Sequence, residues 1–283
     1  AASSGSGSGS GSDGSPAALV SVAFDKGASL VYLLSCAGTI YCFSDEGLCL
    51  LAAHSASPAE EGEAPDLLWF ELTFVAGTGS LVAVSRSGAI CSLDGEQAAA
   101  AAREGRSLKA ERVGVIEGGL AGAAWSPDQS RLLLVTPLSL LSMSCDWEPL
   151  QEVANAPLLQ GSLAGVSWRG DGSGVAVVST DQADGVTRVR LYSDMLELQA
   201  AVRNETAAGQ AGDTSGAALL RGLGASGAVA YAPNGSLVAV PQARVRGRPQ
   251  VAFLESNGLR HADLDLRLPP LPDTAGAGVG VWE

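Results

Sequence analysis

Few side chains in this sequence could carry out chemistry. Only two histidines occur, His54 and His261, and a metal centre or a Ser-His-Asp triad would have to be built around one of them. His54 lies in a run of Ser, Ala and Glu, whereas His261 follows the turn Ser256-Asn257-Gly258 at the start of an outer strand. No Gly-x-Ser-x-Gly elbow is present. We therefore expect surface or turn roles for both histidines and no catalytic residue.

Two motifs resemble ligand sites but stand in the wrong context. The run Gly222-Leu223-Gly224-Ala225-Ser226-Gly227 matches Gly-x-Gly-x-x-Gly, yet we expect a strand after it instead of the helix that would hold a pyrophosphate. The run Glu60-Glu61-Gly62-Glu63 lacks the alternating oxygen ligands of a Ca²⁺ loop. Asp128 and Asp171 follow aromatic residues in expected turns, where a carboxylate usually bonds its own backbone. The sequence thus predicts no cofactor and no metal.

One basic segment is a candidate for partner binding. Arg244, Arg246 and Arg248 alternate between Pro241 and Pro249, so an extended backbone would place the three guanidinium groups on one side. A solubilising hairpin tip and a contact to phosphate or to an acidic partner both fit this pattern. Further arginines that could join such a patch are Arg188, Arg190 and Arg221.

The composition narrows the class of protein. Of 283 residues, 17 are Lys or Arg and 30 are Asp or Glu, which gives a formal net charge of −13 and argues against an electrostatic nucleic-acid platform. A hydrophobic content of 46% argues against a disordered chain. We expect no membrane span, because no apolar run is long enough. The five cysteines lack Cys-x₂-Cys spacing, which favours free thiols in a reducing compartment.

A repeat runs along the chain. Each unit has an alternating strand that ends in an aromatic residue, a polar turn, an apolar strand, a second turn and a further strand. The aromatic residues are spaced from 43 residues (Trp125 to Trp168) to 63 residues (Trp168 to Tyr231) apart. We expect them to pack between neighbouring units, and they are Phe24, Phe74, Trp125, Trp168 and Tyr231, with Trp282 beginning a sixth unit. The 36 glycines supply turn residues that tolerate positive φ.

This repeat predicts an all-β fold, namely an incomplete WD40-like β-propeller of about five blades plus the first strand of a sixth. Residues 1–15 form a flexible Ser/Gly leader, and residues 16–283 form the partial propeller. The segment 95–112 fits a short helix or an exposed loop, and 203–226 fits a flexible insertion between strands. The blades are expected near 17–51, 67–94, 113–150, 158–200 and 226–268, and the sixth near 276.

Several stretches, in this order and at this spacing, resemble the N-terminal propeller of the largest Elongator subunit. They include Trp125-Ser126-Pro127-Asp128-Gln129, Val166-Ser167-Trp168-Arg169-Gly170-Asp171-Gly172 and Phe253-Leu254-Glu255-Ser256-Asn257-Gly258-Leu259-Arg260-His261. The resemblance implies a non-catalytic scaffold in the complex that modifies the wobble uridine (U34) of tRNA. It implies as partners the catalytic radical-SAM and acetyltransferase subunit and a WD40 subunit. Contact with tRNA is implied only through regions outside this chain. The resemblance also implies a cytoplasmic location, with the nucleus as a second compartment.

Two other functions compete with this interpretation. The chain could be another WD40 scaffold, such as a coat or trafficking component. A propeller hydrolase is the alternative from a different class. The hydrolase is disfavoured because no cluster of histidine and carboxylate residues recurs at the ends of the expected inner strands.

Overall fold

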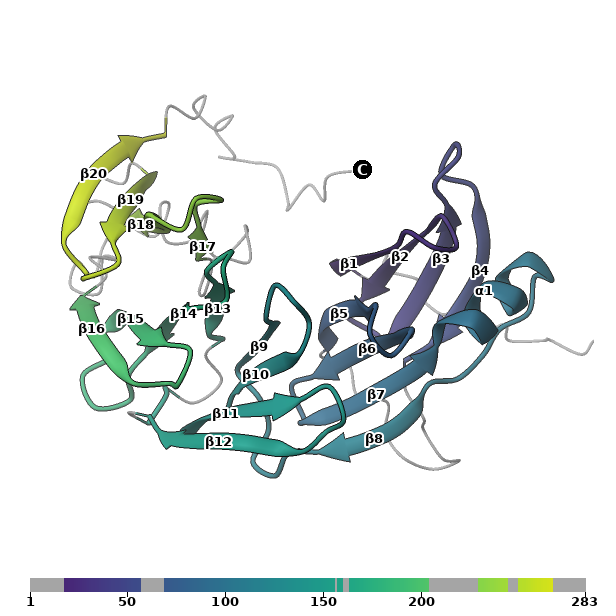
Figure 1. Cartoon of the computed structure of the whole chain (residues 1–283), viewed down its shortest axis with the longest axis horizontal. Coiled ribbons are helices and arrows are strands. Elements are labelled where there is room, and N and C mark those ends of the chain that lie inside the picture. The colour runs from purple at the N-terminus through teal and green to yellow at the C-terminus, as the bar shows by residue number, and fades with distance from the viewer. Residues whose placement is uncertain are drawn as a thin grey trace, which may run out of the picture. The chain divides into compact units, whose positions relative to one another are not determined.

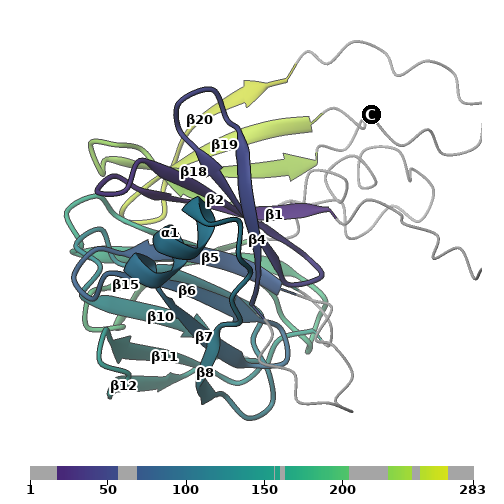
Figure 2. The ribbon, with the colours of Figure 1, turned by 90° about the vertical axis from the view of Figure 1, so that its right-hand side faces the viewer.

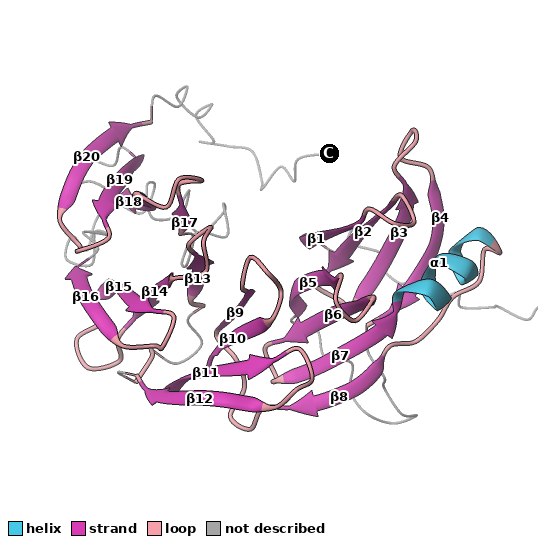
Figure 3. Ribbon diagram, viewed as in Figure 1, coloured by secondary structure: helices cyan, strands magenta, loops and turns pink. Residues whose placement is uncertain are grey.

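The computed structural model describes residues 18–56, 69–155, 157–159, 163–203, 229–243 and 249–266. The expected leader, most of the segment 203–226, the arginines of 244–248 and the expected strand at Trp282 lie outside these residues. Within them, the chain is built almost entirely of β-strands (Figure 3). The prediction of an all-β chain is therefore confirmed.

In the described ranges, twenty strands form five four-stranded sheets, which we call blades 1 to 5 (Figure 1). In each blade the strands pair in the order in which they occur in the sequence. The bounds are as follows: blade 1, β1 (Leu19–Asp25), β2 (Leu30–Ser35), β3 (Thr39–Ser44) and β4 (Leu50–Ser55); blade 2, β5 (Trp69–Val75), β6 (Ser80–Ser85), β7 (Ala89–Asp94) and β8 (Glu111–Val115); blade 3, β9 (Gly122–Trp125), β10 (Arg131–Val135), β11 (Ser139–Ser144) and β12 (Pro149–Ala154); blade 4, β13 (Gly165–Trp168), β14 (Gly174–Thr180), β15 (Thr187–Ser193) and β16 (Leu198–Arg203); blade 5, β17 (Ala230–Tyr231), β18 (Leu237–Ala243), β19 (Pro249–Glu255) and β20 (Arg260–Asp265).

The largest departure from the expected boundaries lies in blade 2. Its fourth strand, β8, begins at Glu111, after the helix α1 (Gly95–Arg103), whereas the sequence placed the end of this blade near residue 94. Asp94 caps the helix, because its Oδ1 accepts a hydrogen bond from Gln97 N at 2.8 Å. The segment 95–112 therefore contains the short helix that was one of its two expected forms, followed by a loop and the start of β8.

Short polar turns join the first two strands of the blades. In three blades an Asx side chain accepts a hydrogen bond from the backbone two residues on, the pattern expected for turn carboxylates and amides. The pairs are Asp25 Oδ1 with Gly27 N at 2.8 Å, Asp171 Oδ1 with Ser173 N at 3.0 Å and Asn234 Oδ1 with Ser236 N at 3.1 Å. In blade 3, Asp128 Oδ1 accepts a hydrogen bond from Ser126 Oγ at 2.6 Å.

The turn between the second and third strands binds the chain that leaves the same blade. In blade 1, Ala56 N donates to the carbonyl of Gly38 at 2.8 Å, and in blade 2, Ile116 N donates to the carbonyl of Gly88 at 2.9 Å. Gly88 has φ +96°, and an added Cβ would lie 2.1 Å from the carbonyl oxygen of Ile116. Glycine is required there because a side chain would enter the departing backbone.

The chain folds into two compact units. Blades 1 and 2 belong to the first unit, blades 4 and 5 to the second, and residues of blade 3 are divided between them. In the first unit, blades 1 and 2 bury a shared apolar core that includes Tyr32, Leu34, Ile40, Trp69, Leu72 and Leu81. In the second unit, blades 4 and 5 share a core formed by Ala176, Val178, Val189, Leu191, Val238, Val240 and Leu254.

The helix α1 belongs to the core of the first unit. Its buried alanines Ala98, Ala99 and Ala102 join the cluster between blades 1 and 2. The spacing of these residues places them on one face of the helix, and Figure 2 shows α1 against β4. Small side chains allow the helix to approach the sheet closely. The insertion in blade 2 thereby packs onto the outermost strand of blade 1.

Candidate functional site

The two histidines are held in different environments. The structure places His54 in β4 with 1% of its surface exposed, whereas a loop or surface position was expected. Its Nδ1 accepts a hydrogen bond from Leu108 N at 3.2 Å, and burial lowers its pKa. His261 lies at the start of β20 on the surface, where Nδ1 is 3.3 Å from Glu255 Oε1. The predicted turn role fits His261, but the expectation for His54 was wrong because the alternation of β4 buries it.

The remaining candidate groups are dispersed or outside the described ranges. Three candidate groups lie in segments that the structure does not describe: the acidic run at 60–63, the glycine motif at 222–227, and the arginines Arg244, Arg246 and Arg248. Among the residues that it does describe, no three His, Cys, Asp or Glu side chains are grouped as metal ligands would be. All five cysteines are free thiols: Cys36, Cys42, Cys49, Cys91 and Cys145. Burial raises the pKa of Cys42 to about 11, which keeps it a thiol at neutral pH.

The aromatic residues that end the first strands have unequal environments. Trp168 is buried, Phe74 packs against the core of the first unit and Tyr231 against the core of the second. Trp125 meets Trp147 edge to face, with ring centroids 6.2 Å apart. Phe24 is 46% exposed, on the same side of β1 as the exposed Val20 and Val22.

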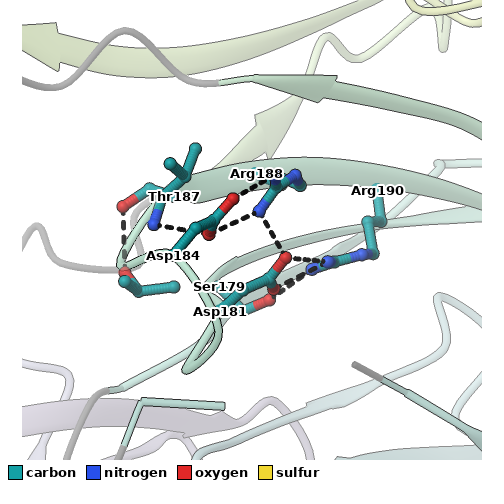
Figure 4. Close-up of polar contacts among 8 residues, drawn as sticks. Ser179, Asp181, Asp184, Thr187, Arg188 and Arg190 are labelled. Carbon is teal, nitrogen blue, oxygen red and sulfur yellow. Dashed lines mark hydrogen bonds and ion pairs between the residues drawn. The ribbon is translucent and has the colours of Figure 1, made fainter. Parts of the chain in front are cut away.

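The most connected polar cluster lies at the end of the β14–β15 hairpin (Figure 4). Arg190 is buried, and its Nη2 donates to both carboxylate oxygens of Asp181, at 2.7 and 2.6 Å. Its Nη1 donates to Ser179 Oγ at 3.0 Å. Arg188 donates to Asp181 Oδ2 at 2.5 Å and also forms a two-pronged contact with Asp184. The two arginines and two aspartates form a cluster with balanced charge.

This cluster changes the interpretation of the nearby arginines. The hydrogen bond from Arg188 holds the pKa of Asp184 down to about 2, so the carboxylate stays charged at neutral pH. Arg188 and Arg190 are consequently occupied by Asp181 and Asp184 and are not free cations for a basic patch. The cluster also supports the chain before blade 4, since Gln182 N donates to the carbonyl of Pro157 at 2.8 Å.

Side chains on the first strands and turns join neighbouring blades. Ser21 Oγ of β1 accepts from Leu72 N of β5 at 3.1 Å, and Ser167 Oγ of β13 accepts from Tyr231 N of β17 at 3.1 Å. Gln129, in the turn after β9, bonds the end of β5 through both atoms of its side-chain amide. Sequence reasoning missed these joints. The only signal was a polar residue within or just after an alternating strand.

The described residues thus form sheets whose polar groups serve chiefly to join strands and blades. Among the parts that the structure describes, no helix is long and apolar enough to cross a membrane. Within each unit, neighbouring four-stranded sheets are joined through their first strands and the turns beside them, as the blades of a β-propeller domain are.

Comparison with known proteins shows which propeller this is. The chain belongs to the family described as "ELP1 first N-terminal beta-propeller", whose model matches residues 37–160 and 159–275. It is 27% identical over 212 residues to Elongator complex protein 1 of Oryctolagus cuniculus and 26% identical over 212 residues to that of Rattus norvegicus. Each match covers 61% of this chain but only 14% of the relative.

Proposed function

We propose that this propeller is a non-catalytic scaffold module of the Elongator complex and supports the modification of the tRNA wobble uridine through protein-protein assembly. The observation that carries the proposal is the family match over both units, residues 37–160 and 159–275. The folded sheets support it, because β-propeller blades present sheet edges and turns to partner proteins.

The charge distribution favours protein partners over direct tRNA binding. The net charge is −13, and the described cationic side chains of blade 4 that seemed available, Arg188 and Arg190, are neutralised by aspartates. Phosphate binding needs clustered, uncompensated Lys and Arg. We therefore place tRNA contact in regions of the parent protein outside this chain, with Arg244, Arg246 and Arg248 as the local exception to be tested.

The proposed partners are the catalytic radical-SAM and acetyltransferase subunit and the WD40 subunit of the complex. The proposed compartment is the cytoplasm, with the nucleus as a second location. Membership of the family supports both proposals.

Affinity purification tests the assembly role. The full-length gene product, tagged at its chromosomal locus, should co-purify with the catalytic Elongator subunit, as identified by mass spectrometry. Recovery of coat or trafficking proteins in its place would overturn the proposal. The same tagged strain provides material for the localisation measurement.

Nucleoside analysis tests the link to tRNA. Depleting the protein should lower the fraction of tRNA that carries modified wobble uridine, and restoring the full-length protein should recover it. An unchanged wobble uridine content after depletion would contradict the proposed role. A full-length variant with Arg244, Arg246 and Arg248 all changed to Ala then tests whether this segment contacts RNA. If the variant still assembles into the complex but the wobble uridine is less modified, the segment is assigned to RNA contact.

A further inference from the structure

The loop that follows α1 occupies the open edge of blade 1. We call residues 107–110 the strap. Ser55 N of β4 donates to Leu108 O at 2.8 Å, and Ala110 N donates to Ser55 O at 2.8 Å. Ser55 and Lys109 form a parallel bridge. Because β4 is the outermost strand of its blade, the strap covers backbone groups that would otherwise form a free sheet edge.

His54 holds the strap through a third hydrogen bond. Leu108 N donates to His54 Nδ1 at 3.2 Å, so Nδ1 carries no proton and the neutral ring carries its proton on Nε2. The ring is almost fully buried, and Nε2 is without a hydrogen-bond partner. Leu108 therefore bonds β4 in both directions, donating to His54 and accepting from Ser55.

We propose that His54 is a proton-sensitive latch: its neutral ring keeps the strap on β4, and its protonation releases the strap and opens the outer edge of blade 1. An imidazolium has a proton on each nitrogen, so Nδ1–H would face Leu108 N–H with no acceptor between them. The charge would also be buried, at 1% exposure of the residue. Release of the strap would give the ring access to water.

The direction of the response follows from the surroundings of His54. Burial lowers its pKa, so the neutral ring is favoured in the folded chain and the strap stays closed above the ordinary histidine pKa of about 6.5. Closure is lost as the pH falls through the lower folded-state pKa. A carboxylate partner would have the opposite effect, because it raises the pKa of a histidine and stabilises the protonated ring.

Two other ionisable groups are buried near the latch, and burial favours the neutral form of both. Tyr32 of β2 and Cys42 of β3 belong to the same buried cluster, and burial raises the pKa of both, that of Cys42 to about 11. Cys91 of β7 also lies in this cluster as a free thiol. The nearby charged groups are Arg103 at the end of α1, the exposed Glu104–Arg106 ion pair and the exposed Lys109.

Hydrogen exchange of the full chain tests the latch. After correction for intrinsic exchange rates, amides of Ser55, Leu108 and Ala110 should be protected at about pH 7.5. They should lose about tenfold protection per pH unit as the pH falls from about 6.5 towards the lower folded-state pKa of His54. Amides of the buried strand β10, such as Leu133 and Leu134, should keep their protection. Unchanged protection of the strap at about pH 5, or a loss that β10 shares, would overturn the proposal.

Two substitutions separate the latch from packing. His54→Asn places an amide oxygen near the position of Nδ1 without a titrating group, so the strap should stay protected at both pH values. His54→Leu removes the acceptor, so the strap should exchange rapidly at both. Acid release that persists in His54→Asn contradicts the mechanism. The ¹⁵N chemical shifts of the His54 ring in the wild type provide a check that needs no variant. A proton on Nδ1 at about pH 7.5 would also contradict the mechanism.

Discussion

Gln129 is bonded to the backbone at Phe74, 55 residues earlier in the sequence. Its Nε2 donates to the carbonyl of Phe74 at 2.8 Å, while its Oε1 accepts from Ala76 N at 2.7 Å. The side-chain amide thus continues the hydrogen-bonding pattern of a strand beyond the end of β5. Gln129 has φ +58°, an uncommon conformation that a glutamine adopts here together with these two bonds. One residue in a turn thereby ties blade 3 to blade 2.

Removing this amide should loosen the joint. Gln129→Ala leaves a carbonyl and an amide without partners at a partly buried site, so we expect a loss of about 1–2 kcal/mol in the free energy of unfolding. Urea denaturation checks the value. Gln129→Glu keeps one acceptor and loses the donor, and should lie between wild type and Gln129→Ala. An alanine variant as stable as wild type would show that the joint contributes nothing.

The buried arginine of blade 4 should be more sensitive than its exposed neighbour. Arg190→Met removes both Nη2 hydrogen bonds to Asp181 in a buried site and leaves Arg188 as the remaining cationic partner, so about 1–3 kcal/mol of stability should be lost. Asp184→Asn, at a carboxylate whose side chain is 43% exposed, should lower the stability much less than Arg190→Met does. Thermal and urea unfolding of both variants measure the difference. Equal effects would show that burial does not distinguish the two sites.

Glu71 should make stability depend on pH. It lies in β5, its Oε1 accepts a hydrogen bond from Thr73 Oγ1 at 3.0 Å, and burial raises its pKa to about 7. A raised pKa means that the folded chain favours the neutral acid, so this stabilisation is complete below about pH 4.5 and is lost as the pH rises through about 7.

The measurement is urea denaturation between about pH 5 and about pH 8. The free energy of unfolding of the wild type should fall by roughly 2 kcal/mol across this range because of Glu71. Glu71→Gln stays neutral, so its free energy of unfolding should lack this part of the pH dependence. A Gln variant that retains the full pH dependence would assign it to other groups. Exposed Glu117→Gln serves as the matched control and should follow wild type.

Gly88 should not tolerate a side chain. In Gly88→Ala the new Cβ would meet the carbonyl oxygen of Ile116 at 2.1 Å and the backbone would keep φ +96°. We expect a loss of about 2 kcal/mol or more, from backbone strain and from displacement of the chain that leaves blade 2. Gly77→Ala, where no atom lies within 4 Å of the added Cβ, should change stability little. Circular dichroism melts compare the two alanine variants directly.

The strand pattern was readable from the sequence because it is local. Alternation such as Val20-Ser21-Val22, followed by Asp25-Lys26-Gly27, places a strand and its turn within a few residues. The Asx bonds of Asp25, Asp171 and Asn234 depend on neighbours only two residues away. Such features need no knowledge of the rest of the chain.

The position of α1 and the burial of His54 could not be read in this way. A run of alanines allows a helix, but its role depends on the apolar core that blades 1 and 2 share, which forms only when both fold. His54 precedes a polar sequence, yet the alternation of β4 turns it inward and the strap, 54 residues further along, covers that strand. Both outcomes rest on long-range contacts.

The sequence by itself determined the all-β class, the turn positions and the family resemblance, because these depend on short-range spacing and residue type. Only the tertiary structure decided which polar groups are free. Arg188 and Arg190 looked like part of a basic patch, but folding brings Asp181 and Asp184 against them. For Arg190 and Asp181 burial decides this outcome, because a desolvated charge must find its partner within the protein.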